Sequence, residues 1–146
     1  MGSKKKIEVG SLGEIEFQKG YYAYTGSALG PGGFARVRRH ESVSDGKIKT
    51  KKWHIDFILP AMEIVEKIKT PSIVSEECRV ARKIGGRTGA IKGFGSTDCR
   101  CESHLHFSPE LNELRAIVKK AHPRKGPRDI LNEIKWRRLD LSKCEV

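Results

Sequence analysis

A glycine-rich stretch near the start of the chain places the strongest constraint on its fold. Residues 26–33, GSALGPGG, contain four glycines and a proline, so they cannot continue a regular strand or helix. Residues 21–25, YYAYT, come just before and are aromatic, which favours a β-strand. Residues 34–42, FARVRRHES, come just after and are expected to form a helix. The sequence therefore predicts a strand, a glycine loop and a helix in succession.

This strand–loop–helix unit has the parts of an anion-binding site. Backbone N–H groups of a glycine loop can approach a phosphate closely, and the first turn of a helix adds a partial positive charge. Arg36 and His40 are four residues apart and share one helix face, where the planar guanidinium of Arg36 can bind the same anion. On the strand, Tyr22 and Tyr24 share a face. The alternative is an ordinary glycine turn beside a solvated arginine face.

The charge of the chain indicates a polyanionic partner. Its 146 residues fit one domain, with 29 Lys and Arg against 18 Asp and Glu and a formal net charge of +11. The arginines cluster at residues 36–39 and 137–138. Cations gathered in this way bind phosphates and release condensed counterions. Nucleic acid is therefore the expected partner, and a solvated basic surface is the alternative.

The composition predicts no contact with a membrane. No window approaches the roughly 18 apolar residues of a spanning helix. Residues 1–6, MGSKKK, are not followed by an apolar run, so no signal peptide is expected. Four cysteines in such a chain predict a reducing compartment, the cytoplasm, with free thiols or a bound metal rather than disulfides.

The other elements are predicted from apolar periodicity and from glycine and proline stops. Residues 7–9 and 14–17 alternate apolar and charged positions around a glycine turn, which predicts a β-hairpin. The further expected elements are a short helix within 51–59, a strand within 62–70, loops over 85–103, and helices over 76–84, 109–121 and 127–139.

Five short motifs occur in the order of a known nuclease signature. They are Gly20-Tyr21-Tyr22-x-Tyr24-x-Gly26-Ser27-Ala28, Arg36-x-x-Arg39-His40, Trp53-His54-Ile55-Asp56, Glu77-Cys78, and Gly93-Phe94-Gly95-Ser96-x-Asp98-Cys99-x-Cys101. Together they resemble the DUF123 branch of the GIY-YIG nuclease superfamily. The resemblance covers residues 7–107 as one domain and leaves residues 108–146 as a C-terminal helical extension.

The resemblance implies a small α/β domain in which helices pack around a three-stranded antiparallel sheet. It also implies an endonuclease that hydrolyses phosphodiester bonds with one divalent ion, Mg2+ or Mn2+. In that scheme Glu77 holds the ion, Arg36 stabilises charge on the phosphate, and Tyr24 helps to activate water. His40 would bond phosphate or water. Glu76 is the alternative metal ligand, and both glutamates also suit the first turn of a helix.

A nucleic-acid-binding surface is expected around the same residues, with DNA favoured over RNA. The expected contacts are Gly26, Ser27, Arg36, Arg38, Arg39, Lys51 and Lys52. A non-catalytic binding module or adaptor is the alternative function, because it needs the basic face and the glycine loop but no glutamate.

One departure from the superfamily pattern bears on catalysis. The signature begins with a G-x-Y strand, and no such triplet precedes residue 20, so we expect this chain to lack that strand and its general-base tyrosine. Tyr22 is the conceivable substitute. A missing strand would also leave a sheet edge for a partner strand or chain to cover.

The cysteines form a second candidate site. Cys78, Cys99, Cys101 and His104 offer three sulfurs and one imidazole, a valid donor set for structural zinc, with His106 as a competitor for His104. The alternative is a loop with free thiols and a buried Cys78. Cys144 has no counterpart and is expected to be free. His54 and Asp56 do not share a helix face, so one of them is expected to brace the active site.

Overall fold

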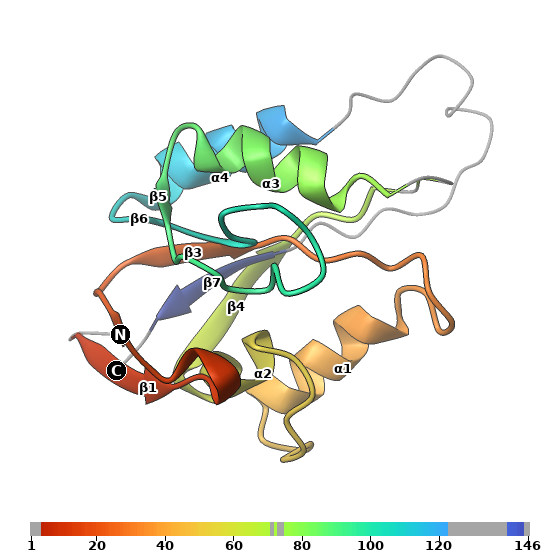
Figure 1. Cartoon of the computed structure of the whole chain (residues 1–146), viewed down its shortest axis with the longest axis vertical. Coiled ribbons are helices and arrows are strands. Elements are labelled where there is room, and N and C mark those ends of the chain that lie inside the picture. The colour runs from red at the N-terminus through yellow and green to blue at the C-terminus, as the bar shows by residue number, and fades with distance from the viewer. Residues whose placement is uncertain (1–3, 71, 73–74, 123–139, 145–146) are drawn as a thin grey trace.

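The chain folds around an antiparallel sheet of five strands in the order β4-β7-β3-β6-β5 (Figure 1). This architecture comes from a computed structural model that describes residues 4–70, 72, 75–122 and 140–144. The strands of this sheet are β3 (Tyr21–Tyr24), β4 (Met62–Lys67), β5 (Gly89–Ala90), β6 (Leu105–Ser108) and β7 (Asp140–Cys144).

A separate two-stranded sheet forms from the first described residues. Strands β1 (Lys5–Glu8) and β2 (Glu14–Phe17) pair antiparallel, with Ile7 opposite Ile15. The short 3-10 turn η1 (Gly10–Leu12) joins them. The predicted hairpin is therefore confirmed.

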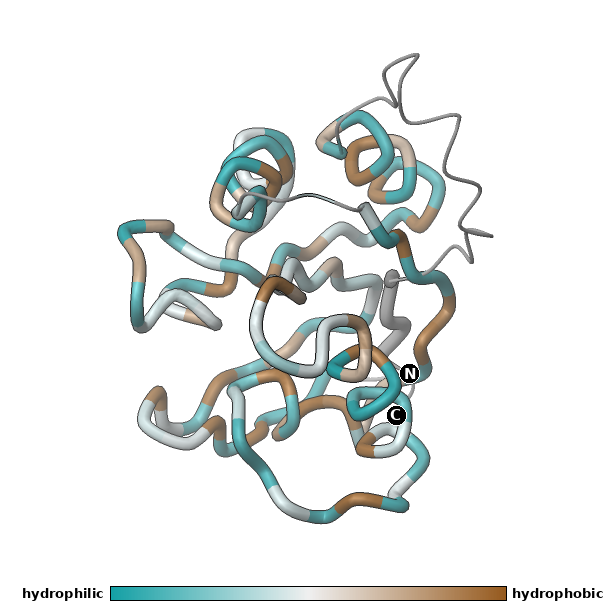
Figure 2. Tube along the Cα trace, turned by 90° about the vertical axis from the view of Figure 1, so that its right-hand side faces the viewer, coloured by the Kyte–Doolittle hydropathy of each residue, from teal (hydrophilic) through white to brown (hydrophobic). Residues whose placement is uncertain are grey.

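Within the described residues, four α-helices cover the main sheet. They are α1 (Ala35–Ser44), α2 (Ile55–Ile58), α3 (Glu77–Gly85) and α4 (Leu111–Ala121), and the 3-10 turn η2 (Leu59–Ala61) follows α2. Figure 1 shows α3 and α4 together on one side of the sheet, and α1 and α2 on the other. Figure 2 shows polar and apolar residues alternating along the helices, as expected for elements that bury a single face.

Strand β3 separates two hydrophobic cores. Its Tyr22 is fully buried on the side of α1 and α2, in a cluster with Phe17 and Phe94. Its Ala23 is buried on the opposite side, in a cluster with Val80 of α3 and Leu114 of α4. The predicted alternation along this strand is therefore confirmed, and residues after its end emerge between the two helix layers.

The expected α/β class, with helices around an antiparallel sheet, is confirmed. The sheet has five strands where the family resemblance implied three. Strand β7, from the C-terminal segment, pairs with both β3 and β4, so this segment takes part in the sheet. The helix predicted over 127–139 lies outside the described residues. None of the helices within the described ranges has the length and apolar character needed to cross a membrane.

Candidate functional site

A polar cleft of about 210 Å3 lies where the end of β3, the glycine loop, α1 and the start of α3 meet. The segment before α2 and the loop after Phe94 complete its wall. The residues that line it are Tyr24, Gly26, Ser27, Arg36, His40, Lys52, Trp53, His54, Glu77, Gly95, Thr97 and Asp98. The structure therefore brings together residues from all five sequence motifs.

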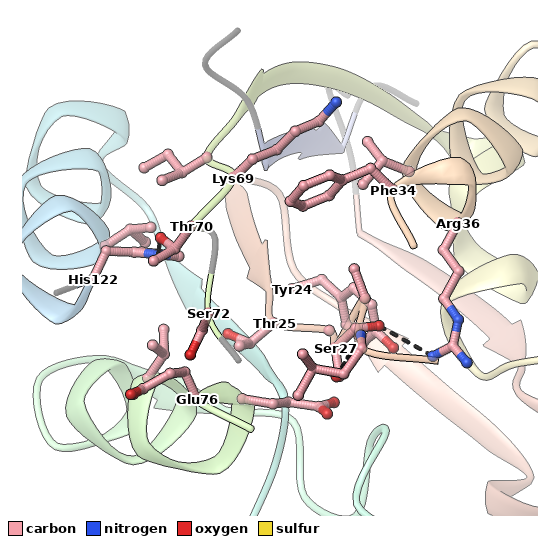
Figure 3. Close-up of a pocket in the computed structure, with 18 of the residues that line it drawn as sticks. Tyr24, Thr25, Ser27, Phe34, Arg36, Lys69, Thr70, Ser72, Glu76 and His122 are labelled. Carbon is pink, nitrogen blue, oxygen red and sulfur yellow. Dashed lines mark hydrogen bonds between the residues drawn. The ribbon is translucent and has the colours of Figure 1, made fainter. Parts of the chain in front are cut away.

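Arg36 is fixed at the cleft by the glycine loop. Its Nη1 donates a hydrogen bond to the carbonyl oxygen of Ser27 at 3.1 Å, which Figure 3 marks with a dashed line. Its guanidinium also lies 5.5 Å from the centre of the Trp53 ring. A Cβ atom at Gly30 would lie 2.7 Å from Nη2 of Arg36, so the missing side chain at Gly30 makes room for the guanidinium.

Two more cations surround Trp53, but only one of them belongs to the cleft. Arg39 and Lys52 place their charged groups 4.8 and 4.9 Å from the ring centre. Arg39 forms an ion pair with Asp56, whose two carboxylate oxygens each lie 2.8 Å from Nη1. Asp56 is completely buried, so its negative charge offsets that of Arg39. Arg36 and Lys52 therefore supply the positive charge that lines the cleft.

Asp56 also holds the segment that carries Lys52 and Trp53. Its Oδ2 accepts hydrogen bonds from their backbone N–H groups at 2.8 and 3.1 Å. This matches the expectation that one polar residue of the Trp53–Asp56 motif braces the site. Of the other predicted nucleic-acid contacts, Arg38 and Lys51 are exposed outside the cleft.

His40 lies one helical turn after Arg36. Its ring packs edge-on against Tyr24 and Trp53, with centroids 6.1 and 5.7 Å away. Its Nδ1 lies 3.4 Å from Oδ1 of Asp56. Burial lowers the pKa of His40, and the Asp56 charge only partly opposes this shift. His40 is therefore neutral at neutral pH, as a proton acceptor must be.

His54 anchors the loop that closes the cleft. Its Nδ1 accepts a hydrogen bond from the backbone N–H of Gly95 at 3.1 Å, and its ring packs against Phe94. Gly95 has a φ of +70°, and a Cβ atom there would crowd His104 and Tyr24. Thr97 and Asp98 also line the cleft and were not among the predicted site residues, although the GFGSTD motif that contains them was the available signal.

The two candidate tyrosines lie in different environments. Tyr24 lines the cleft between the rings of His40 and Phe94. Tyr22 is fully buried in the core and donates its hydroxyl hydrogen to the carbonyl oxygen of Gln18 at 2.8 Å. The cleft therefore includes Tyr24 and not Tyr22.

Glu77, the first residue of α3, connects the cleft to a second group of side chains. It lines the cleft, and its carboxylate is only 22% exposed. Its Oε1 lies 2.9 Å from Nδ1 of His104. The neighbouring Glu76 forms an ion pair with Arg79 and does not line the polar cleft. The geometry thus separates the two glutamates, which were alternatives on the basis of sequence.

Behind Glu77, three cysteines and His104 form a Cys3His cluster that could hold a metal ion. The ligand atoms of Cys78, Cys99, Cys101 and His104 all lie within 4.8 Å of one another. His104 Nε2 is 3.4 Å from Sγ of Cys99 and 3.9 Å from Sγ of Cys78. His106 lies outside this cluster.

The neighbours of Cys78 within the cluster disfavour its ionisation. Hydrogen bonding to Cys101, together with burial, raises the pKa of the Cys78 thiol to about 12. A bound divalent ion would reverse this preference at Cys78, because it stabilises thiolates. The four donors can therefore act as a ligand set for such an ion.

A second, mostly apolar cavity of about 290 Å3 adjoins the polar cleft (Figure 3). Phe34 and Arg36 of the α1 region lie on one side of it, and Thr70 and His122 lie on the other. The end of β3, with Tyr24 and its neighbours, runs between them. We call this the apolar cavity; it shares a wall with the polar cleft.

Comparison with known proteins gives one match. No curated protein and no solved structure matches the chain. Residues 1–126 match the family model described as domain of unknown function DUF123. This match spans most of the sequence and includes every residue of the polar cleft and of the Cys3His cluster. The chain therefore belongs to the DUF123 family.

Proposed function

We propose that this protein binds nucleic acid through the polar cleft and hydrolyses a phosphodiester bond there with a divalent ion. The observation that carries the proposal is that Arg36 and Glu77, a fixed cation and a half-buried carboxylate, line the same small cleft. The net charge of +11 favours a polyanionic substrate.

Each residue has a chemical role in this proposal. Arg36 receives a non-bridging phosphate oxygen and stabilises the charge that builds there during cleavage. Lys52 adds attraction for the backbone. Tyr24 and the neutral imidazole of His40 are the groups available to orient water or to accept its proton.

The donors in the cleft fit a hard divalent ion. Mg2+ prefers oxygen ligands and keeps most of its waters, so one carboxylate plus a substrate phosphate is enough. Glu77 uses Oε1 for His104, and among the described residues Oε2 makes no hydrogen bond, so Oε2 is the oxygen left for the ion. When bound, Mg2+ or Mn2+ would polarise the phosphate and lower the pKa of a bound water.

The resemblance to the GIY-YIG signature supports this reaction, because the residues that match its catalytic positions gather in one cleft. The alternative function is a nucleic-acid-binding module without catalysis. It is favoured by two observations: Glu77 already orients His104, and Tyr22 is buried away from the cleft.

We also propose that the Cys3His cluster holds a structural Zn2+ ion. Three sulfurs and one imidazole are a common zinc donor set, and a Zn–S bond of about 2.3 Å places tetrahedral ligands roughly 3.8 Å apart. The donor atoms here already lie within 4.8 Å of one another. The Glu77–His104 hydrogen bond supplies the carboxylate that usually orients a zinc-bound histidine.

The cleavage proposal is tested with Glu77→Gln, with Glu76→Gln as its matched control. An amide oxygen can still accept the hydrogen bond from His104, so Glu77→Gln removes the charged metal ligand and leaves the support of His104 in place. We expect Mg2+- or Mn2+-dependent cleavage of nicked, branched, duplex or single-stranded substrates to fall at least about 100-fold. Glu76→Gln should cleave like the wild type. Unchanged cleavage by Glu77→Gln would reject the metal assignment.

Binding is tested separately with Arg36→Ala, and Arg38→Ala on the same helix is its matched control. Arg38 is exposed outside the cleft, so its removal lowers the net charge equally without touching the cleft. We expect Arg36→Ala to weaken nucleic-acid binding more than Arg38→Ala does. Wild-type affinity should fall by about 10³ or more between 50 and 200 mM salt if several phosphates are contacted. Binding without cleavage by the wild type would favour the module.

A further inference from the structure

We propose that the apolar cavity receives an unpaired nucleobase whose phosphate lies in the neighbouring polar cleft. The preferred substrate would then be a single-stranded or locally unpaired nucleic acid. This inference rests on the proposed nucleic-acid function and adds to it the class of substrate.

The first observation is that the two cavities adjoin each other along a shared wall. Six of their lining residues are common to both cavities: Tyr24, Gly26, Ser27, Arg36, His40 and Glu77. Arg36, the residue proposed to bind the phosphate in the cleft, therefore lies at the boundary between a polar space and an apolar one. A nucleotide has the same two-part character, with a charged phosphate attached through its sugar to a flat base.

The second observation is an exposed aromatic side chain beside this boundary. Within the described part of the chain, the large hydrophobic side chains that are exposed are Leu29, at 49%, and Phe34, at 36%, and both line the apolar cavity. Lys69 lies 5.2 Å from the centre of the Phe34 ring. Figure 3 shows Lys69 and Phe34 together on the cavity wall. An aromatic ring next to a cation is the usual platform for stacking a base on a charged backbone.

The third observation is the lining of the cavity interior. Apolar side chains of α1, α3 and α4 contribute, including Val37, Val80 and Val118. Polar residues line the rest of this space, among them Thr70 and His122, whose Oγ1 and Nδ1 atoms lie 2.6 Å apart. A mostly apolar pocket with a few placed polar groups is the common form of a small-ligand site.

These features select an unpaired base over a paired one. A base stacked inside a duplex presents neither of its faces, so it cannot lie against Phe34 or enter a cavity. A base in a single strand, a loop or a flipped position presents a face, and it pays less unstacking energy to do so. The polar cleft alone would bind phosphates of either form, since phosphate contacts carry no sequence or pairing information.

The test compares strands that differ only in their bases. Fluorescence anisotropy would measure binding to labelled oligodeoxythymidylate, to an abasic sugar-phosphate strand of equal length, and to a blunt duplex. We expect the wild type to prefer oligodeoxythymidylate over the abasic strand by about tenfold or more. Oligouridylate in the same assay separates RNA from DNA as the source of the unpaired base.

Variants of Phe34 test whether its ring is responsible for the preference for oligodeoxythymidylate over the abasic strand. Phe34→Ala and Phe34→Leu should lose it, because leucine keeps apolar volume but has no ring, and Phe34→Trp should keep it. Duplex binding should stay within about twofold in all three. Equal wild-type affinity for the thymidylate and abasic strands, or a Phe34→Leu variant that keeps the preference, would overturn the inference and leave the phosphate proposal standing. If the wild type binds none of the strands, the proposed function itself fails.

Discussion

The polar cleft and the Cys3His cluster lie on the two sides of Glu77, and they have opposite electrostatic needs. The cleft has Arg36 and Lys52 along its wall and is open to solvent, so it attracts anions. The cluster gathers three sulfurs and an imidazole within 4.8 Å of one another, a donor set that suits a cation. One carboxylate serves both regions, because Oε1 bonds His104 and the side chain also lines the cleft. The roles of Glu77 in the two sites can therefore be separated only by substitutions that remove its charge and keep its shape, or remove both.

The largest expected effect is loss of the cluster metal. Cys99→Ser should release about one zinc per chain and lower the free energy of unfolding by more than ~4 kcal/mol, because a structural metal contributes its binding energy to folding. Metal analysis and denaturant unfolding measure the two quantities. A chelator should bring the wild type down to the stability of the variant. A wild-type protein that contains no metal, and whose free energy of unfolding does not change with a chelator, would contradict the zinc proposal.

A smaller effect is expected when the support of His104 is removed. Glu77→Ala leaves Nδ1 of His104 without its carboxylate, which typically weakens zinc affinity about 10- to 100-fold. Glu77→Gln should weaken it much less, because the amide oxygen keeps the hydrogen bond. Competition against a zinc chelator measures both variants. Equal zinc affinity in the two variants would mean that Glu77 does not orient the histidine.

The smallest expected effect is the contribution of His40, in the cleft, to the pH dependence of stability. The folded-state pKa of His40 is lowered below its ordinary value of 6.5, chiefly by burial, with Arg39 and Arg36 adding to the shift and Asp56 opposing it. The unfolded state therefore binds more protons, and the free energy of unfolding should fall as the pH drops below about 6.5. His40→Gln should flatten this decline when unfolding is followed across pH. The pKa values of His122 and His106 are also lowered, that of His106 to about 4, so an unchanged slope in His40→Gln would assign the decline to these two histidines.

Much of the fold and part of the site were predictable from local sequence. The strand, glycine loop and helix from Tyr21 onward form as expected, because glycine spacing and side-chain alternation are local signals. The grouping of Arg36 with Glu77 and the Cys3His donor set were predicted from motifs. The structure brings each set together.

Other features depend on contacts between distant segments, which local patterns do not encode. Strand β6 is only four residues long, and its LHFS sequence lacks a clear alternation, so its pairing with β3 was not predicted. Arg39 was predicted to contact phosphate, but in the structure it pairs with the buried carboxylate of Asp56. Tyr22 was a candidate for the site because it shares a strand face with Tyr24. Its complete burial depends on how distant segments pack around it, which the local sequence does not encode.

The position of β7 has a consequence for how the sheet assembles. Strand β7 lies between β3 and β4, so the two earlier strands have no neighbour in common until residues 140–144 arrive (Figure 1). A ribosome releases those residues long after β3 and β4 have emerged, and the closure of so long a loop makes folding slow. A nascent chain would therefore carry a divided sheet with open edges, which invite pairing with other chains. Loss of residues 140–144 would remove an interior strand rather than trim an edge.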